Sequence, residues 1–267
     1  MDQQSKVAVI GAGVMGEALI AALISSGVKP HHITISEKRE DRAQELISKY
    51  SIKAAALNAN VSDADALLLV VKPQDMATVL EEIKGSINPK AVVITFAAGK
   101  TISFISNGLG TSNPVIRVMP NTPTLVGKGM AAASMSAGVT DAQRDFVLGF
   151  LEATGTVIEV SEDLQDAVTA TSGSGPAYFF AFVEAMVNGA KELGLSEKDA
   201  TTLTVQTIIG AAKLLEESGK NATTLRENVT SPSGTTAAAL ASFGDANLDS
   251  IVAKAMKAAR DRSQELA

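Results

Sequence analysis

Two glycine-containing turns in this 267-residue chain have the composition of anion-binding loops. The first, GAGVMG at residues 11–16, follows an apolar run and opens a helical pattern. The second, SPSGTT at residues 231–236, begins a run of good helix formers, TTAAAL. Backbone N–H groups at the start of a helix carry a partial positive charge that suits phosphate or carboxylate. Two such turns therefore predict two anionic ligand groups.

The first turn fits the G-x-G-x-x-G pattern of a dinucleotide-binding βαβ unit. In that setting Gly11 permits the tight turn, Gly13 lets the backbone approach the pyrophosphate, and Gly16 lets helix and strand pack closely. Val14 and Met15 complete the predicted contact. A glycine-rich turn without a ligand is the alternative.

The end of the second expected strand bears on which dinucleotide binds. Glu37 follows the last glycine by about 20 residues, where an acid accepts a hydrogen bond from the ribose 2′-OH of NAD. Lys38 and Arg39 instead suit the 2′-phosphate of NADP. With Ser36 these residues form the predicted ribose contact, and we expect NADPH, with NADH as an alternative, if Glu37 turns toward solvent. A solvated start to the next helix would explain the same residues.

Two later strand ends are expected to line the same crevice. In doubly wound sheets, ligands bind outside the carboxyl ends of the strands. Lys72 would line the crevice, and Asn121 would lie beside the nicotinamide, although a solvated lysine and a structural turn are open alternatives. The predicted cofactor contacts at these strand ends are Val71, Lys72, Pro73, Met119, Pro120 and Asn121.

The order of apolar patterns predicts two domains. Up to about residue 160, strand-like runs alternate with helical patterns, which indicates an α/β, Rossmann-type dinucleotide-binding domain. Beyond Ser161 the pattern is helical only. We therefore expect a dinucleotide-binding domain at 1–161 and an all-α dimerisation domain at 162–267. Strands are expected at 6–10, 33–36, 66–71, 91–98, 114–119 and 156–160, and the later helices at about 163–172, 176–193, 197–218, 235–242 and 247–265.

Two of the later helices are apolar on nearly every face, YFFAFVEAMVNGA at 178–190 and LTVQTIIGAAKLL at 203–215. A surface helix needs a polar stripe, and a small helical domain cannot bury two such helices by itself. We therefore expect a homodimer or higher homo-oligomer formed through the C-terminal helices. Glu184 is the acid within the first segment. It either makes a structural contact at the oligomer interface or has a perturbed pKa or a buried hydrogen bond.

The amino-acid composition limits the kinds of molecule that the protein is expected to bind. The net charge of −6 without a basic tract argues against nucleic acid and anionic membranes. The chain has no cysteine, and its two histidines, His31 and His32, are adjacent and fit a solvated loop, so no metal site is expected. No segment resembles a signal peptide or a membrane span, which leads us to expect a cytoplasmic protein that binds small molecules.

Five motifs in order resemble the pyrroline-5-carboxylate reductase family: VAVIGAGVMGEAL, VVKPQ, RVMPNTP, AVTATSGSGPAYFF and LRENVTSPSGTTAAAL. The resemblance covers nearly the whole chain and implies reduction of 1-pyrroline-5-carboxylate, a cyclic imino acid, to L-proline with NAD(P)H. It departs from the family where Ser233 replaces the first glycine of Pro-Gly-Gly, which matters if that position needs a positive φ.

The resemblance also implies roles for the second turn. Its residues would hold the substrate carboxylate, and Thr236 would hydrogen-bond the ring nitrogen as the catalytic residue. The implied substrate-binding residues are Asn228, Ser231, Ser233, Gly234, Thr235 and Thr236.

Two other functions are considered. A 3-hydroxyacid dehydrogenase-like enzyme would need a lysine on the helix after the domain junction and an asparagine four residues later. That stretch has no lysine before Lys191, and Leu195 stands four positions on. A non-catalytic nucleotide-sensing protein would have no need of the carboxylate loop.

Overall fold

A computed structural model describes residues 1 and 4–266 and divides the chain into two compact units. The first unit is Met1–Ser174 together with Ala259–Ala267, and the second is Gly175–Ala258. The division into 1–161 and 162–267 stays a prediction. In the structure, residues 162–174 belong to the first unit, because the buried side chain of Gln165 hydrogen-bonds Ala132 and Ser134 of the sheet.

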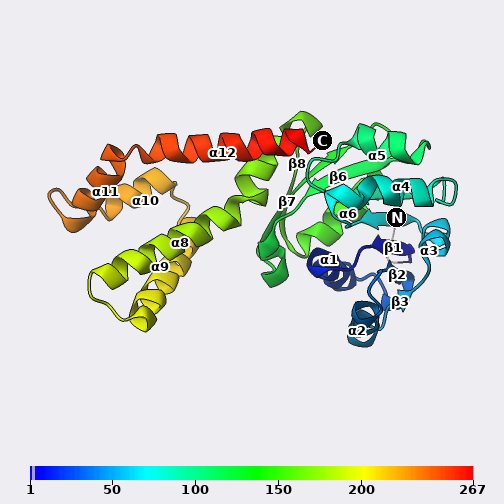
Figure 1. Ribbon diagram of the computed structural model, residues 1–267, viewed down its shortest axis with the longest axis horizontal. Helices are drawn as coiled ribbons and strands as arrows, with labels where there is room; N and C mark the ends of the chain where they lie inside the picture. The colour runs from blue at the N-terminus through cyan, green and yellow to red at the C-terminus, as the bar shows by residue number, and fades with distance from the viewer. Residues whose placement is uncertain (2–3, 267) are drawn as a thin grey trace. The chain divides into compact units, whose positions relative to one another are not determined.

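The first unit is built on one eight-stranded sheet with the order β3-β2-β1-β4-β5-β6-β7-β8 (Figure 1). All neighbouring strands are parallel except β6 and β7, which are antiparallel. The predicted Rossmann-type α/β fold is confirmed. The strands are β1 (Val7–Ile10), β2 (Ile33–Ser36), β3 (Lys53–Ala54), β4 (Ala66–Leu69), β5 (Val92–Thr95), β6 (Val115–Met119), β7 (Gly129–Met135) and β8 (Gly155–Glu159).

Helices cover both faces of this sheet (Figure 1). Val7 and Val9 of β1 belong to a core cluster with α1, α2 and α6, whereas Ala8 and Ile10 belong to a cluster with α3, α4 and α5. Because side chains alternate along a strand, a fully apolar β1 is the pattern of a strand buried on both faces. These helices are α1 (Val14–Ser25), α2 (Glu40–Tyr50), α3 (Leu57–Asp63), α4 (Met76–Ile83), α5 (Ile102–Leu109) and α6 (Asp141–Glu152).

Short turns of helix join these elements. The segment predicted as one helix at 163–172 is broken into a 3₁₀ turn, the short helix α7 and a π-helical segment. The short elements are η1 (Pro30–His32), η2 (Pro73–Asp75), η3 (Thr122–Val126), η4 (Glu162–Leu164), α7 (Gln165–Val168) and the π-helical η5 (Thr169–Gly173).

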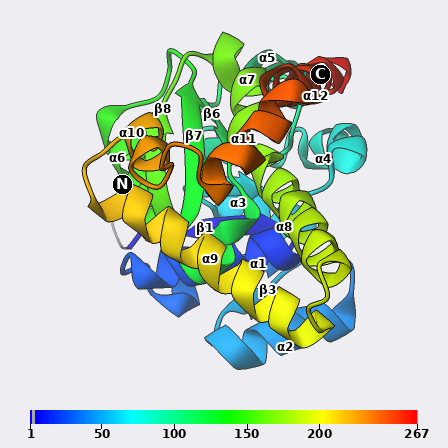
Figure 2. The same cartoon turned by 90° about the vertical axis from the view of Figure 1, so that its left-hand side faces the viewer.

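The second unit is all-helical, as predicted. Helices α8 and α9 pack side by side (Figures 1 and 2), and Phe182 of α8 lies 6.3 Å, ring to ring, from Phe243 of α11. The last helix begins in this unit and ends in the first. The helices are α8 (Gly175–Glu192), α9 (Glu197–Glu217), α10 (Ala222–Asn228), α11 (Thr235–Asp245) and α12 (Leu248–Glu265).

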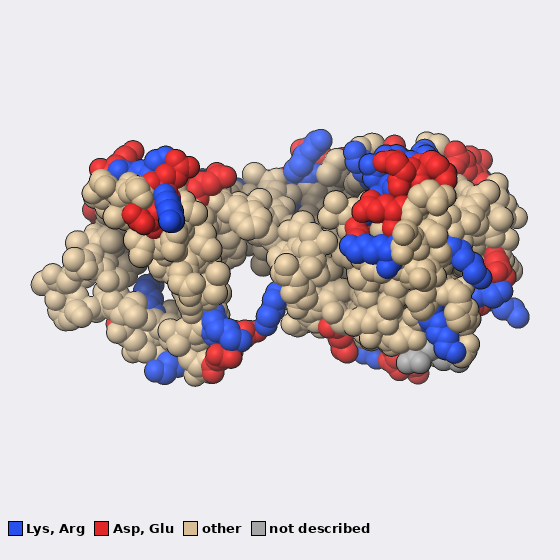
Figure 3. Space-filling view, turned by 90° about the horizontal axis from the view of Figure 1, so that it is seen from below, with Lys and Arg blue, Asp and Glu red and all other residues tan. Residues whose placement is uncertain are grey.

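Large apolar side chains of the second unit lie exposed on the single chain. Phe179 and Phe180 are 67% and 63% exposed, and Leu203 and Ile209 of α9 exceed half exposure. Much of the face of this unit seen in Figure 3 carries no charged side chain. Such a patch marks an association surface. Within the described part of the chain, no helix combines the length and hydropathy that crossing a bilayer requires.

Candidate active site

A crevice of about 660 Å³ opens at the carboxyl ends of β1, β2 and β4. Eight of the predicted cofactor residues line it together: Gly11, Gly13, Ser36, Glu37, Lys38, Arg39, Val71 and Lys72. Four of them, Ser36 to Arg39, come from one strand end, which places Lys38 and Arg39 at the same crevice as Glu37. A concave site of this size at the strand ends of a doubly wound sheet suits a dinucleotide.

The three glycines of the first turn play different structural parts. Gly11 has φ of +86°, which favours glycine, and follows β1 directly. A side chain at Gly16 would collide with the carbonyl oxygen of Gly11, so this glycine serves the packing of α1 on the turn. Gly13, the residue before α1, has nothing within 4 Å of where a Cβ would stand. The backbone at Gly13 is therefore open to a ligand.

Glu37 does not turn toward solvent as expected. Its Oε2 accepts a hydrogen bond from the backbone N–H of Ala12 at 2.9 Å, and its Oε1 accepts one from the N–H of Arg39 at 3.1 Å. Its side chain is only 12% exposed, against 61% for that of Arg39. The N–H of Ala12 holds the acid on the glycine-rich turn, and the N–H of Arg39, two residues further along, fixes its other oxygen.

A second set of side chains, missed by sequence reasoning, supports the same turn from α1 and α2. Arg42 donates from Nε to the carbonyl oxygen of Ala12 at 3.1 Å and pairs with Glu17. Lys49, at 2.8 Å, and Tyr50, at 3.0 Å, also donate to Glu17. The hydrogen bond from Lys49, followed by those from Arg42 and Tyr50, lowers the pKa of Glu17 to about 2 despite partial burial.

The other predicted cofactor residues do not line this crevice. Val14, Met15 and Gly16 belong to the start of α1, and Pro73 begins η2. Asn121 donates from Nδ2 to the carbonyl oxygen of Ser172 at 3.1 Å and accepts from the N–H of Met130 at 2.9 Å. Its side chain thus holds the RVMPNTP turn, next to Met119 and Pro120, and its place beside the nicotinamide stays a prediction. Residues that the sequence did not single out also line the crevice: Ala55, Ala56, Leu57, Asp75, Val79 and Glu82.

The SPSGTT turn of the second unit joins α10 to α11. Gly234 precedes α11 in an extended conformation, and within the described chain no side chain caps that helix. Ser231, through its carbonyl oxygen, accepts a hydrogen bond from the N–H of Gly234 at 3.0 Å and closes the turn. Since side-chain capping is the alternative use of serine and threonine here, its absence leaves the first N–H groups of α11 available for an anion.

Ser233 adopts φ of +60° in this turn. That is the left-handed region, where a side chain costs energy that glycine does not pay. The condition stated from the sequence is therefore met: this position has a positive φ, and serine in place of the family's glycine strains the backbone there. Asn228 ends α10, and Thr235 and Thr236 begin α11, so the six predicted substrate residues lie within one helix-turn-helix segment. Glu184 is exposed on α8.

Comparisons with known proteins agree with this arrangement. Residues 162–266 match the family described as pyrroline-5-carboxylate reductase dimerisation, and residues 6–99 match the family described as NADP oxidoreductase, coenzyme F420-dependent. A pyrroline-5-carboxylate reductase of Corynebacterium melassecola is 40% identical over 264 residues, covering 97% of this chain and 98% of that protein. One from Pseudomonas aeruginosa is 39% identical, covering 98% and 97% of the two chains.

Solved structures give the same result. A pyrroline-5-carboxylate reductase of Coxiella burnetii superposes with a TM-score of 0.91 at 34% identity, covering 99% of each chain. A pyrroline carboxylate reductase of Plasmodium falciparum, solved with NADP bound, has a TM-score of 0.87 at 26% identity and covers 100% of this chain and 99% of its own. By near-complete coverage at this level of identity, the chain belongs to the pyrroline-5-carboxylate reductase family.

Proposed function

We propose roles for the two glycine-containing turns in an enzyme that reduces 1-pyrroline-5-carboxylate to L-proline, the last step of proline biosynthesis. The GAGVMG turn holds the pyrophosphate of NADPH, and the SPSGTT turn holds the substrate carboxylate. The observation that carries the second assignment is the helix start of α11, where Gly234 provides no side-chain cap. The N–H groups of that helix start then donate to the carboxylate.

The crevice of the first unit fits the cofactor. The backbone at Gly13 has room for a pyrophosphate, and Lys38, Arg39 and Lys72 add positive charge around the opening. The nicotinamide supplies the hydride when it is bound. Lys38 and Arg39 favour NADPH through the 2′-phosphate, and the inward Glu37 allows appreciable use of NADH.

The chain's own part in the reaction is binding and orientation. Thr236 directs its hydroxyl to the ring nitrogen of the imino acid, and Asn228, Ser231, Ser233 and Thr235 shape the loop around the carboxylate. A protonated cyclic imine is already electrophilic, and holding reactants in position contributes about 7–11 kcal/mol in favourable cases. The assigned residues include no histidine, so no side-chain acid is assigned.

The protein is a homo-oligomer through its dimerisation region, and we propose that the apolar faces of α8 and α9 form the dimer. We expect an interface of obligate size, roughly 2,000 Å² or more, that includes the exposed side chains of Phe179, Phe180, Leu203 and Ile209. A monomer in light scattering at micromolar concentration would overturn this. We also propose that the enzyme works in the cytoplasm.

The test of the proposed function is a steady-state assay with fixed imino acid and either NADPH or NADH. We expect proline to form in step with cofactor oxidation, faster with NADPH. Cofactor oxidation that does not depend on the imino acid would contradict the assignment. Normal turnover in a variant that lacks the Thr236 hydroxyl would contradict the role proposed for Thr236, but not the proposed reductase activity.

A further inference from the structure

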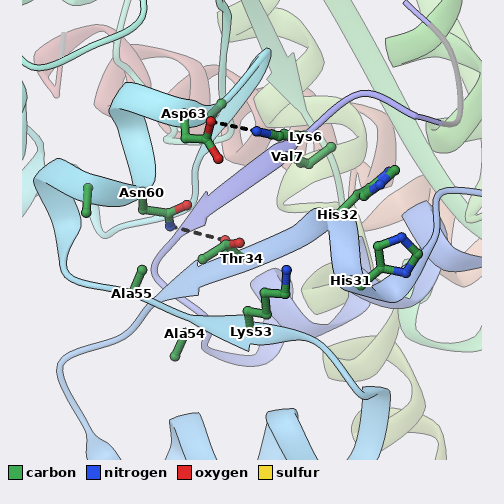
Figure 4. A pocket seen from close by; sticks show the side chains of 12 residues that line it. Lys6, Val7, His31, His32, Thr34, Lys53, Ala54, Ala55, Asn60 and Asp63 are labelled. Atoms are coloured by element: carbon green, nitrogen blue, oxygen red, sulfur yellow. Dashed lines mark hydrogen bonds and ion pairs between the residues drawn. The ribbon is translucent and has the colours of Figure 1, made fainter.

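A second cavity, of about 420 Å³, lies beside the amino ends of β1 and β2 (Figure 4). It is separate from the glycine-rich turn, which follows the carboxyl end of β1. Side chains from β1, η1, β2, β3 and α3 surround it, and none of the roles proposed above uses them. Its charged and polar side chains include Lys6, His31, His32, Lys53, Asn60 and Asp63.

The histidine pair is more than the solvated loop expected from the sequence. The rings of His31 and His32 lie 4.3 Å apart in an edge-to-face arrangement. Nδ1 of His32 is buried and has no hydrogen-bond partner in the part of the chain that the structure describes. Buried polar atoms ordinarily have a partner, so this nitrogen points to a ligand.

Of the residues that the structure describes, two lysines and only one carboxylate line the cavity. Its one acid, Asp63, is already paired with Lys6 at 2.7 Å. In Figure 4 the amine of Lys53 points toward the turn that carries the histidines, and it makes no ion pair with any described residue. Partial burial and then the positive fields of His32, Lys29 and Lys53 lower the pKa of His31. Among the described residues that line the cavity, no carboxylate is left to pair with Lys53.

The remaining wall is small and apolar, from Val7, Ala54, Ala55, Ala59 and Ala64. The volume exceeds what an inorganic anion fills, so the cavity accommodates a compact organic body attached to a charged group. A lysine ammonium binds phosphate as a charge-assisted donor, and an imidazole N–H can donate to phosphate whether or not the ring is charged. Asn60 keeps the wall in place, since its Nδ2 donates to the carbonyl oxygen of Thr34 at 3.1 Å and to Ser36 at 3.0 Å.

We propose that this cavity binds the phosphate group of a small metabolite, with Lys53, His31 and His32 as its donors. The site is additional to the nucleotide crevice, with which it shares Ala55, and its two histidines precede the amino end of β2.

The test uses the two histidines as reporters, because they are the only ones in the chain. The intact oligomer carrying ¹³C at histidine Cε1 is titrated with sodium phosphate and with glycerol 3-phosphate, at constant ionic strength with chloride as the reference anion. We expect a saturable shift of the histidine signals and a rise in the pKa of His31. Saturation by the ester at lower concentration supports a metabolite, and equal affinities identify free phosphate as the ligand. A shift no larger than that with chloride overturns the proposal.

Variants separate this cavity from the nucleotide crevice. Lys53→Ala removes an exposed side chain of the short edge strand β3 and should weaken phosphate binding roughly tenfold or more, the usual effect of losing a hydrogen bond to a charged group. Lys72→Ala is the matched control, because it removes the same charge from the nucleotide crevice. If Lys72→Ala abolishes the histidine shifts and Lys53→Ala does not, the phosphate lies in the nucleotide crevice and the proposal is wrong.

Discussion

The carboxylate of Glu37 accepts a hydrogen bond from the backbone N–H of Ala12 at 2.9 Å, which fastens the end of β2 to the glycine-rich turn. The same acid lines the crevice beside Lys38 and Arg39. In the proposed mode of cofactor binding, this acid lies beside the ribose, where it would repel a 2′-phosphate.

The first prediction follows from this position. Glu37→Ser removes the repulsion and the acceptor, so kcat/KM for NADPH should rise while kcat/KM for NADH falls about 10- to 100-fold, the effect of losing a hydrogen bond worth ~1.5–3 kcal/mol. Steady-state kinetics with both cofactors measure this. Glu40→Ser is the control, since Glu40 starts α2 outside the crevice. If the ratio of the two efficiencies stays constant, Glu37 does not face the ribose.

A second prediction separates two glycines of the first turn. Gly13→Ala should fold normally, because its φ is −66° and the added methyl group meets open space, but cofactor binding should weaken about tenfold as the pyrophosphate loses its approach. Gly16→Ala should instead lower the thermal midpoint, since its methyl group collides with Gly11. Thermal melting and cofactor titration of both variants test this, and unchanged cofactor affinity in Gly13→Ala would be the contrary result.

For the second turn, Thr236→Ala should reduce kcat/KM for the imino acid about 10- to 100-fold, if its hydroxyl binds a charged ring nitrogen. The dissociation constant of NADPH should stay the same. Thr236→Ser keeps the hydroxyl and should retain most activity, whereas Thr223→Ala on α10 serves as the neutral control. Equal loss of activity in the serine and alanine variants would show that the methyl group, not the hydroxyl, matters.

The backbone of this turn gives a stability prediction. Ser233→Gly should raise the free energy of unfolding by about 0.5–1 kcal/mol. Glycine removes the backbone strain of a side chain at positive φ, and this gain exceeds the loss caused by the greater conformational freedom of glycine in the unfolded chain. Ser231→Gly, at a position without positive φ, should lower it instead. Urea unfolding at one fixed protein concentration compares the two. The reverse order of stabilities would contradict the observed φ.

Glu17 makes stability depend on acid pH. Its pKa is lowered from 4.5 to about 2 in the folded chain, chiefly by the hydrogen bond from Lys49. A depressed pKa stabilises the fold above the ordinary value and loses that effect as the pH falls toward 2. Glu17→Gln should therefore flatten the stability profile in this window, and Lys49→Met should flatten it in part. Parallel profiles for wild type and Glu17→Gln would exclude this linkage.

The parallel core of the fold follows from sequence because its strands are short, continuous apolar runs. Strand β7 was missed because GMAAASM is rich in alanine, which has little strand propensity, and it is held by pairing with β6. Strand β3 has only two residues, and α10 is short and polar. Such elements form through their neighbours and not through a pattern of their own.

The candidate site shows the same division. Glycine spacing and the ends of apolar runs identify Gly11, Gly13 and Glu37, since each depends on local position. The contact from Arg42 to Ala12 joins residues 30 positions apart, so no local pattern reveals it. The inward orientation of Glu37 depends on a contact of the same long-range kind, because its partner is the N–H of Ala12, 25 positions earlier.

The first unit is discontinuous, and this affects how the protein is made. Lys100 donates to the carbonyl oxygen of Leu266 at 2.7 Å, and Ser263 donates to Asp166 at 2.7 Å, so the final turn of α12 completes a surface begun much earlier in the chain. During synthesis the sheet emerges from the ribosome long before these residues do. The last contacts of the first unit therefore form only after the whole helical unit has been translated.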